Sequence, residues 1–209
     1  MSRPRIFVLA GVNGAGKSTI GGAALRRISM GWFNPDTFTR QLMESTGSPL
    51  ASANAAAWQE GVCRLDHAIA TGRDFAFETT LGGNTIPAKL HAAATTHDVL
   101  MWYCGLDTPE HHLARVRFRV SQGGHDIPEA KIRERCVSSI ANLIALLPHL
   151  ARLQLYDNSV DATVGLATPD PCLLLQTEHS RIAWPIDVAT LKLTPDWAKP
   201  VLEAALFMQ

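Results

Sequence analysis

The chain has 209 residues, 46% of them hydrophobic, which suits one domain with a substantial buried core. Lysine and arginine together number 19, as do aspartate and glutamate, so no net field would attract nucleic acid or an anionic membrane. The four cysteines lie far apart without a Cys-x-x-Cys pair, which argues against a zinc site and a disulfide framework. We expect one domain, with a core over about residues 5–160 and a C-terminal extension over about residues 161–209.

Targeting signals are not evident in the sequence. The apolar run before the first glycine cluster is too short for a secretion signal. No later stretch reaches the roughly 18 apolar residues of a membrane span. The expected location is therefore the cytoplasm, without a membrane partner.

Short apolar runs alternate with longer helical segments, a pattern typical of an α/β domain with a parallel sheet. The predicted strands comprise residues 5–10, 32–34, 74–77, 99–104 and 153–156. The predicted helices run from the glycine cluster to about residue 27 and over residues 51–70, 86–94, 109–120 and 128–147. Beyond them, the pattern predicts a hairpin of residues 172–176 and 181–184 and a helix over residues 195–207. The prediction is a three-layer α/β/α fold with a mainly parallel five-stranded sheet, a helical lid and a small C-terminal hairpin plus helix.

Residues 11–19 read Gly-Val-Asn-Gly-Ala-Gly-Lys-Ser-Thr and match the P-loop pattern Gly-x-x-x-x-Gly-Lys-Ser. In that pattern glycines let backbone N–H groups surround a phosphate, the lysine places a charge on the β- and γ-phosphates, and the hydroxyl ligates Mg²⁺. The motif lies between a predicted strand and a predicted helix, as this chemistry requires. The residues expected to bind ATP are Gly11, Asn13, Gly14, Ala15, Gly16, Lys17, Ser18 and Thr19, with Ser18 as the ligand of Mg²⁺.

Missing motifs narrow the class of P-loop protein. The chain has no Asn-Lys-x-Asp motif, which argues against a GTPase. No apolar run ends in Asp-Glu or Asp-Asp, so a strong Walker B element is missing. Residues 121–125, Ser-Gln-Gly-Gly-His, resemble the signature loop of ABC transporters only superficially. Small-molecule kinases often place their acids elsewhere, and they fit this pattern better than ATPase motors.

Two acids stand where predicted strands end. Ligands of a parallel sheet gather at the carboxyl ends of its strands, and a kinase needs a carboxylate there to accept the proton of the acceptor hydroxyl. Asp36 and Glu78 are the candidates. Asp36, in Asn-Pro-Asp, can alternatively cap the helix that follows, and Glu78 can alternatively mark an exposed strand end.

An arginine-rich segment precedes the glycine pair at residues 123–124. Arg115 and Arg119 share one face of the predicted helix. Asp126 and Glu129 are spaced like the capping box of the next helix. A helix, loop and helix with arginines on the inner side predict a lid that closes over ATP, although any one of these arginines can instead lie on a solvated face.

The remaining candidates are weaker. Adjacent residues diverge on a helix, so His111 and His112 are expected at the surface rather than as a metal pair. His125 can contact phosphate or pack within the loop, and Lys131 is expected at the surface. Residues 157–159, Asp-Asn-Ser, can line an adenine pocket or form a turn. The five tryptophans are expected to pack in the core or the hairpin rather than to stack on a base.

Together these motifs closely resemble the zeta toxin family of P-loop kinases, and in particular its compact branch of predicted ABC-type ATPases or kinases. The resemblance covers about residues 5–160. The motifs that carry it are residues 11–19, Asn-Pro-Asp at 34–36, Phe-Glu-Thr-Thr-Leu at 77–81, Arg-Val-x-x-Arg-Val at 115–120, Gly-Gly-His-Asp-Ile-Pro at 123–128 and Tyr-Asp-Asn-Ser at 156–159. The resemblance implies a P-loop NTPase fold and a kinase that uses ATP and Mg²⁺. Zeta toxins phosphorylate a sugar hydroxyl of UDP-N-acetylglucosamine and so poison cell-wall synthesis.

The resemblance also implies roles for individual residues. Lys17 would hold the phosphates with Ser18, Asp36 would be the general base, and Arg115 or Arg119 would act from the lid. The residues implied for the acceptor are Asp36, Arg40, Glu78, Thr79 and Thr80. Those implied for the nucleotide besides the P-loop are Asp157 and Asn158, and those implied for the lid are Arg119, Gly123, Gly124, His125 and Arg135. The second lid cation can be His125, Arg133 or Arg135.

The resulting hypothesis is an ATP- and Mg²⁺-dependent kinase that phosphorylates a hydroxyl of a small acceptor. UDP-N-acetylglucosamine or another nucleotide or nucleotide sugar is the acceptor class that the resemblance implies, with a small antitoxin as a candidate partner. The P-loop begins at residue 11, so the helical segment that precedes it in larger toxins, where an antitoxin docks, is expected to be absent. Two alternatives stay open: a regulatory ATPase module without phosphotransfer, and a polynucleotide 5′-hydroxyl kinase, which would need a basic channel.

Overall fold

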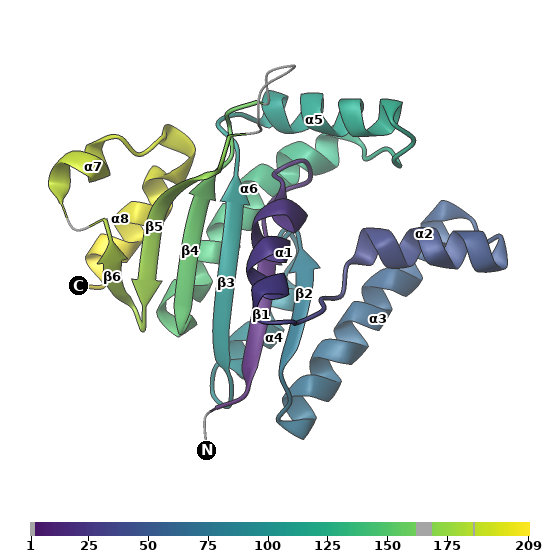
Figure 1. The fold of residues 1–209 in the computed structure, drawn as a ribbon, viewed down its shortest axis with the longest axis horizontal. Coiled ribbons are helices and arrows are strands. Elements are labelled where there is room, and N and C mark those ends of the chain that lie inside the picture. The colour runs from purple at the N-terminus through teal and green to yellow at the C-terminus, as the bar shows by residue number, and fades with distance from the viewer. Residues whose placement is uncertain (1–2, 162–168, 186) are drawn as a thin grey trace.

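A six-stranded sheet with the order β2-β1-β3-β4-β5-β6 forms the centre of the computed structural model, which describes residues 3–161, 169–185 and 187–209 (Figure 1). Neighbouring strands from β2 to β4 pair in parallel, and β5 and β6 continue the sheet as antiparallel strands. The strands are β1 (Arg5–Ala10), β2 (Phe75–Thr79), β3 (Asp98–Gly105), β4 (Arg152–Asp157), β5 (Cys172–Glu178) and β6 (Arg181–Trp184). The carboxyl ends of the four parallel strands therefore meet at one edge of the sheet, where ligands of such folds bind.

Helices cover both faces of the sheet and give the predicted three-layer α/β/α arrangement. α1 lies on the face toward the viewer in Figure 1, and α4, α6 and α8 lie on the other face. The helices are α1 (Lys17–Arg27), α2 (Pro35–Thr46), α3 (Leu50–Thr71), α4 (Thr85–Ala93), α5 (Pro109–Ser121), α6 (Glu129–Leu146), α7 (Val188–Lys192) and α8 (Lys199–Phe207), with short 3₁₀ turns at Leu147–His149 and Asp196–Ala198. Within the described residues, none of these helices is both long enough and apolar enough to cross a membrane.

Successive side chains of β1 point to opposite faces of the sheet and enter two different hydrophobic clusters. Ile6 and Val8 point into the larger core, which they share with residues of α4, α6 and α8. Phe7 and Leu9 point the other way and pack with Leu25 of α1. A fully apolar strand buried on both faces is typical of a parallel sheet. This burial fixes β1 and, with it, the position of the loop that leaves its carboxyl end.

The predicted number of strands was wrong. Residues 32–34 form one bridge rather than a strand: the N–H of Phe33 donates to the Ala76 carbonyl at 2.8 Å, and its carbonyl accepts from the N–H of Glu78 at 2.9 Å. Pro35 has no N–H to extend the ladder and begins α2 instead. The predicted hairpin is present, but β5 pairs with β4, so the hairpin extends the central sheet.

The described part of the C-terminal region also contributes to the larger core. Leu175 of β5 and Val201 and Ala205 of α8 are fully buried there. Trp197 packs against the same cluster and stacks on the Tyr103 ring at 6.3 Å between ring centroids. The sheet and its core therefore draw on residues from both ends of the chain.

Two predicted helix caps differ in the structure. Asn34 rather than Asp36 caps α2, because the Asn34 side chain accepts from the N–H of Thr37 at 3.0 Å. The capping box predicted for α6 is absent. Pro128 occupies the cap position, and the Asp126 carboxylate accepts from the N–H of the residue that follows it. Asp36 is therefore not used as the cap of its own helix.

Candidate active site

The P-loop, residues 11–19, joins β1 to α1 and depends on its glycines. Gly11 and Gly16 have φ values of 136° and 87°, which other residues rarely adopt. A Cβ at Gly11 would collide with the Cys104 carbonyl, and one at Gly16 with the Asn158 side chain. Because the first N–H groups of α1 lack helical partners, this tightly held turn presents donors suited to an anion.

Lys17 is the cation of the loop. Its ammonium donates to the Val12 carbonyl at 3.4 Å. Desolvation lowers the pKa of Lys17 from its ordinary value, while the Glu78 and Asp36 carboxylates favour the charged form. The negative oxygens of a bound triphosphate would favour the charged form further. The buried lysine is therefore suited to bind phosphate.

Glu78 contacts the hydroxyl that the motif assigns to the metal. Its Oε1 atom accepts from Ser18 Oγ at 2.7 Å and from Trp32 Nε1 at 2.8 Å, and the residue is buried. Glu78 lies within β2 rather than after it, on the strand that neighbours β1. The sequence indicated Glu78 as a candidate acid but not its contact with Ser18, because a single Glu in Phe-Glu-Thr carries no Walker B signal.

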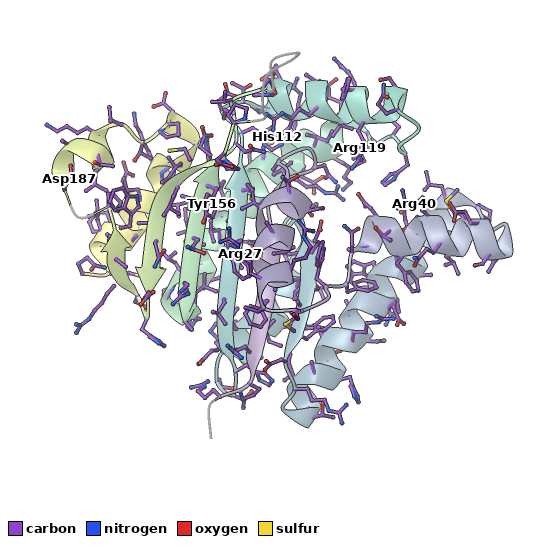
Figure 2. All side chains as sticks on the ribbon, in the orientation of Figure 1. Arg27, Arg40, His112, Arg119, Tyr156 and Asp187 are labelled. Atoms are coloured by element: carbon purple, nitrogen blue, oxygen red, sulfur yellow. The ribbon has the colours of Figure 1, made fainter. Side chains whose placement is uncertain are left out.

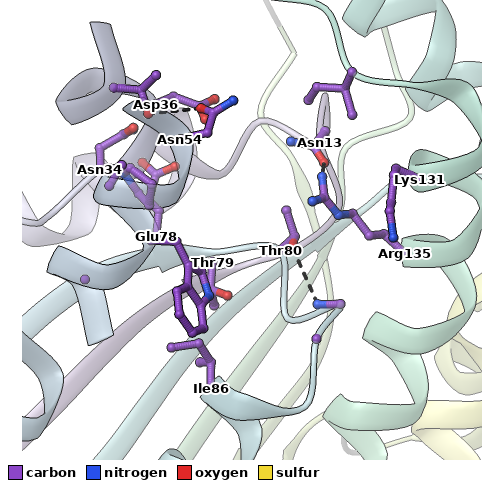
Figure 3. A pocket seen from close by; sticks show the side chains of 18 of the residues that line it. Asn13, Asn34, Asp36, Asn54, Glu78, Thr79, Thr80, Ile86, Lys131 and Arg135 are labelled. Carbon is purple, nitrogen blue, oxygen red and sulfur yellow. Dashed lines mark hydrogen bonds between the residues drawn. The ribbon is translucent and has the colours of Figure 1, made fainter. Parts of the chain in front are cut away.

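A cavity of about 590 Å³ opens beside the P-loop. Figure 3 shows Asn34, Asp36 and Asn54 on one wall and Lys131 and Arg135 on the opposite wall. The predicted site residues that line the cavity are Asn13, Lys17, Asp36, Glu78, Thr79, Thr80, His125 and Arg135. The candidate base and the candidate phosphate-binding lysine thus face one space, although they come from different parts of the chain.

Asp36 meets the lid across this cavity. Arg119 Nη1 donates to Asp36 Oδ2 at 3.2 Å, and His125 Nε2 lies 3.8 Å from Asp36 Oδ1. The Asp36 side chain is 50% exposed, so a solvent-borne molecule can reach it. The lid thus brings the positive charge of Arg119 next to the carboxylate.

The turn between α5 and α6 shapes this lid. Gly123 has a φ of 89°, and the N–H of Gly124 donates to the Arg119 carbonyl at 3.0 Å. A Cβ at Gly124 would lie 2.9 Å from that carbonyl oxygen, too close for any other residue. Arg119 Nη2 in turn donates to the His125 carbonyl at 3.4 Å. The glycine pair therefore folds the loop back, so that Arg119 and His125 both reach Asp36.

Asn13 fastens the P-loop to the lid helices. His112 Nδ1 donates to the Asn13 carbonyl at 2.8 Å, and Arg135 Nη1 donates to Asn13 Oδ1 at 2.7 Å, as Figure 3 shows for Arg135. A Cβ at Gly82 would lie 2.6 Å from Arg135 Cγ, so the absence of a side chain at Gly82 leaves room for the Arg135 side chain. α5 and α6 thereby hold one residue of the P-loop from two sides.

The zeta toxin family matches residues 1–159 of the chain. This match covers well over half of the sequence and includes every element that builds the cavity. The chain belongs to the zeta toxin family. No curated protein matches it in sequence.

Solved structures support the fold of this zeta toxin family member. AvrRxo1-ORF1:-ORF2 with ATP has a TM-score of 0.64 at 15% identity, covering 97% of this chain and 64% of that chain. The PezAT toxin-antitoxin system of Streptococcus pneumoniae has a TM-score of 0.62 at 14% identity, covering 100% and 86%. A putative kinase from Chloroflexus aurantiacus has a TM-score of 0.53 at 15% identity, covering 64% and 78%. At these identities the solved structures support the fold, and the chain spans 64% of the AvrRxo1 chain.

Four further residues that the family resemblance implies for the site have contacts or positions that the structure describes. Arg115 Nη2 donates to Asp161 at 2.8 Å, and its Cβ lies 3.3 Å from the place of a Cβ at Gly14 of the P-loop. Arg40 is exposed on α2 and does not line the cavity (Figure 2). Asp157 accepts from Trp197 Nε1 at 3.0 Å, whereas its neighbour Asn158 donates to the Ala15 carbonyl at 2.9 Å and so supports the P-loop.

Of the three candidates for the second lid cation of this zeta toxin family member, Arg135 comes nearest to the P-loop. Arg133 pairs with Glu110 at 2.8 Å and with Glu129 and does not line the cavity. His125 Nε2 lies 3.8 Å from Asp36 Oδ1. The geometry therefore pairs Arg119 with Asp36 and Arg135 with the phosphate side of the cavity.

His112 corrects a surface prediction, whereas Lys131 is exposed as predicted. His112 is only 3% exposed, because α5 packs this side against the P-loop. Lys131 lines the cavity and pairs with Glu134 at 2.9 Å. Nothing in the local sequence indicates either position, since both depend on how α5 and α6 dock on the rest of the fold.

Replacement of His112 tests how much its hydrogen bond to the Asn13 carbonyl contributes to nucleotide binding. His112→Leu is expected to weaken binding of an ATP analogue about tenfold, the equivalent of one buried hydrogen bond of about 1.4 kcal/mol. His112→Asn keeps a donor near the position of Nδ1 and should bind within about threefold of wild type. Calorimetric titration measures both, and equal weakening in the two variants would contradict a role for the hydrogen bond.

Acid should destabilise the folded protein through the same histidine. Burial lowers the pKa of His112 from 6.5 to about 4, whereas the unfolded chain retains the ordinary value. The unfolded state then binds more protons, so the free energy of unfolding falls as the pH falls from about 6.5 toward about 4. His112→Leu should lack this contribution in urea titrations across that range, and an unchanged pH dependence would contradict it.

Proposed function

We propose that the chain transfers the γ-phosphate of ATP to a hydroxyl of a small acceptor, with Asp36 as general base. The observation that carries the proposal is the meeting of Asp36 and Lys17 in one cavity, with Arg119 bonded to Asp36 and Arg135 bonded to Asn13 of the P-loop. A phosphoryl transfer needs these parts: a lysine on the phosphates, a carboxylate for the acceptor proton and lid cations for charge on the moving group. The proposal treats the chain as one kinase domain acting in the cytoplasm.

Each residue has a defined task in this reaction. Lys17 and the P-loop N–H groups hold the phosphates, which fixes the direction of the γ-phosphate. When the γ-phosphate binds, Arg119 exchanges its contact with Asp36 for the phosphate oxygens and so frees the carboxylate. Asp36 then accepts the proton of the acceptor hydroxyl while that oxygen attacks the phosphorus.

Mg²⁺ fits the donors beside the P-loop. Mg²⁺ prefers oxygen ligands and is commonly held by one or two protein groups together with substrate phosphates. Within the described residues, no group of three or more His, Cys, Asp or Glu could hold a metal by itself, so the nucleotide would supply the remaining ligands. The Ser18 hydroxyl and the Glu78 carboxylate, 2.7 Å apart, would hold the ion. When bound, Mg²⁺ neutralises charge on the phosphates.

Glu78→Gln tests this assignment. The amide oxygen can still accept from Ser18 and Trp32, so the fold should persist. Loss of the negative charge should raise the Mg²⁺ concentration needed for half-maximal ATP binding by about tenfold, or about 1.4 kcal/mol. Glu60→Gln, on the exposed side of α3, is the control and should leave the Mg²⁺ dependence unchanged. An unchanged dependence in Glu78→Gln would remove Glu78 from the metal site.

A toxin role and an antitoxin partner extend the proposal. The family match and the likeness to the PezAT toxin-antitoxin system support this possibility. The chain spans 64% of the AvrRxo1 chain, so partners of the larger proteins do not transfer directly. UDP-N-acetylglucosamine and other nucleotide sugars are the acceptors that the family resemblance implies.

An acceptor screen tests the proposed reaction. The protein is incubated with ATP, Mg²⁺ and pools of sugars, nucleosides, nucleotide sugars and oligonucleotides with a 5′-hydroxyl, and products are read by mass spectrometry. We expect one small acceptor to gain a phosphoryl group. ATP binding without phosphorylation of any acceptor would favour a regulatory module, and a phosphorylated oligonucleotide would favour a polynucleotide kinase.

A further inference from the structure

Trp197 lies in the 3₁₀ turn at Asp196–Ala198, beyond the residues that the zeta toxin family matches. Its ring packs against the larger core, as expected of the tryptophans. Trp58 contradicts that expectation, because it is 50% exposed and lines the cavity. The indole N–H of Trp197 donates to Asp157 Oδ1 at 3.0 Å, at the carboxyl end of β4. A residue of the C-terminal region thus contacts the edge of the sheet at which the P-loop lies.

The Asp157 carboxylate connects the C-terminal region to two loops. Besides the indole N–H, its Oδ1 atom accepts from Ser159 Oγ at 2.6 Å. Ser159 Oγ in turn accepts from the N–H of Asp107 at 2.8 Å, in the segment that follows β3. Hydrogen bonds to an ionised acceptor are stronger than those between neutral groups. This series of bonds fixes residues 157–159 where the chain leaves β4.

Asn158 lies within this segment and reaches the P-loop. Its N–H donates to the Gly105 carbonyl at 3.0 Å, and its side-chain Nδ2 donates to the Ala15 carbonyl at 2.9 Å. In a planar trans peptide the C=O and N–H groups point in opposite directions, so the bond to the Ala15 carbonyl orients the N–H of Gly16. That N–H is one of the donors that the P-loop offers to phosphate. The position of Asn158 therefore affects how the P-loop presents its donors.

Packing holds the indole in one orientation. A Cβ at Gly105 would collide with the six-membered ring of Trp197, so the indole lies directly on the backbone at the end of β3. On the same strand, the Tyr103 ring stacks on the indole, and the Tyr103 hydroxyl shares a hydrogen bond with Ser139 of α6 at 2.8 Å. These packing contacts need only an aromatic ring, whereas the bond to Asp157 needs the indole N–H. Substitution can therefore separate the packing of Trp197 from its hydrogen bond.

We infer that Trp197 is a positioning residue for the nucleotide, which acts through Asp157 and Asn158 on the P-loop. This inference rests on the proposed binding of ATP and extends the nucleotide site to the C-terminal region. The indole N–H restrains the Asp157 carboxylate, the carboxylate restrains residues 157–159, and the Asn158 amide restrains the Ala15 carbonyl. A P-loop that is ordered before ATP binds loses less conformational freedom on binding, so each restraint raises the affinity.

Trp197→Phe removes the hydrogen bond and keeps an aromatic ring on Tyr103. In the presence of Mg²⁺, the variant should bind a non-hydrolysable ATP analogue about fivefold more weakly, the equivalent of one hydrogen bond. The melting temperature should fall by less than about 4 °C, because the packing contacts remain. Trp184→Phe also loses an indole N–H, which donates to the Leu173 carbonyl at 3.4 Å within the hairpin, and should bind like wild type. Equal affinity of Trp197→Phe and wild type overturns the inference.

A double-mutant cycle tests the route through Asn158. Asn158→Ala alone removes the donor to the Ala15 carbonyl and should weaken binding of the ATP analogue about tenfold. Because Trp197 acts through this amide, addition of Trp197→Phe to Asn158→Ala should cause a further loss of less than about twofold. A merely structural tryptophan would weaken binding by the same factor in both backgrounds, and that result overturns the inference.

Kinetics with the acceptor separate this inference from the proposed function. In Trp197→Phe, the KM for ATP should rise about fivefold, while kcat and the KM for the acceptor stay within about twofold of wild type. A fall in kcat without a change in the KM for ATP overturns the inference and leaves the kinase intact. A coupled loss of affinity in a protein that phosphorylates no acceptor supports the positioning role and overturns the kinase. Absence of ATP binding in the wild-type protein overturns both.

Discussion

Asp36→Asn is expected to lose phosphotransfer by a factor of about 10²–10⁴, the usual contribution of a positioned general base. The amide has the shape of the carboxylate but cannot accept the proton of the acceptor. ATP binding should persist within about threefold, because Asp36 lies on α2 and outside the P-loop. Single-turnover phosphorylation of the acceptor and calorimetric titration of an ATP analogue provide the two measurements.

A neighbouring acid on the same helix controls for this substitution. Glu44→Gln removes a charge from the exposed side of α2 without touching the cavity, so both activity and ATP binding should stay at the wild-type level. If Asp36→Asn retained more than a tenth of the wild-type rate, Asp36 would not be the base. Loss of ATP binding in Asp36→Asn would instead indicate a role in placing the nucleotide.

Lys17→Met is expected to lower phosphotransfer by a factor of about 10²–10³, as removal of one preorganised charge from a reaction site does. The methionine keeps the length of the side chain but not the charge that binds the β- and γ-phosphates. Binding of the ATP analogue should weaken as well, since the lysine contacts the phosphates before the reaction. Thermal unfolding should show no loss of stability, because desolvation already disfavours the ammonium when no nucleotide is bound.

Lys131→Met is the matched control for the lysine. Lys131 lines the same cavity, but its charge is paired with Glu134 on α6. Its removal should change the affinity for the ATP analogue by less than about twofold. Equal loss of affinity in the two variants would show that general positive charge, rather than the position of Lys17, binds the phosphates.

Much of the fold was predictable because local patterns determine it. The apolar run of β1 and the glycines that follow it predicted the boundaries of β1 and α1 correctly. The failures concern pairing. Residues 32–34 form only one bridge to β2 because α2 begins at Pro35, and residues 172–184 extend the sheet because β5 pairs with the edge of β4. Neither partner can be recognised from the segment itself.

In the candidate site, too, local motifs predicted some residues, and packing between distant segments placed the others. The P-loop and the strand ends carry their own signals, and the structure brings Lys17, Asp36 and Glu78 together. His112 and Trp58 carry none, because their neighbours come from distant helices that meet only in the fold. Arg115 shows the reverse case: its spacing with the next lid arginine is right for one helix face, yet Arg115 pairs with Asp161 whereas Arg119 pairs with Asp36.

The most direct test of the account follows the fate of the γ-phosphate. Phosphorus NMR of a reaction with ATP, Mg²⁺ and the acceptor found by the screen separates the phosphorylated acceptor from inorganic phosphate. The account predicts that nearly all of the phosphate lost from ATP appears on the acceptor, and that Asp36→Asn abolishes this signal. Release of the phosphate to water alone, with the acceptor unchanged, would contradict it.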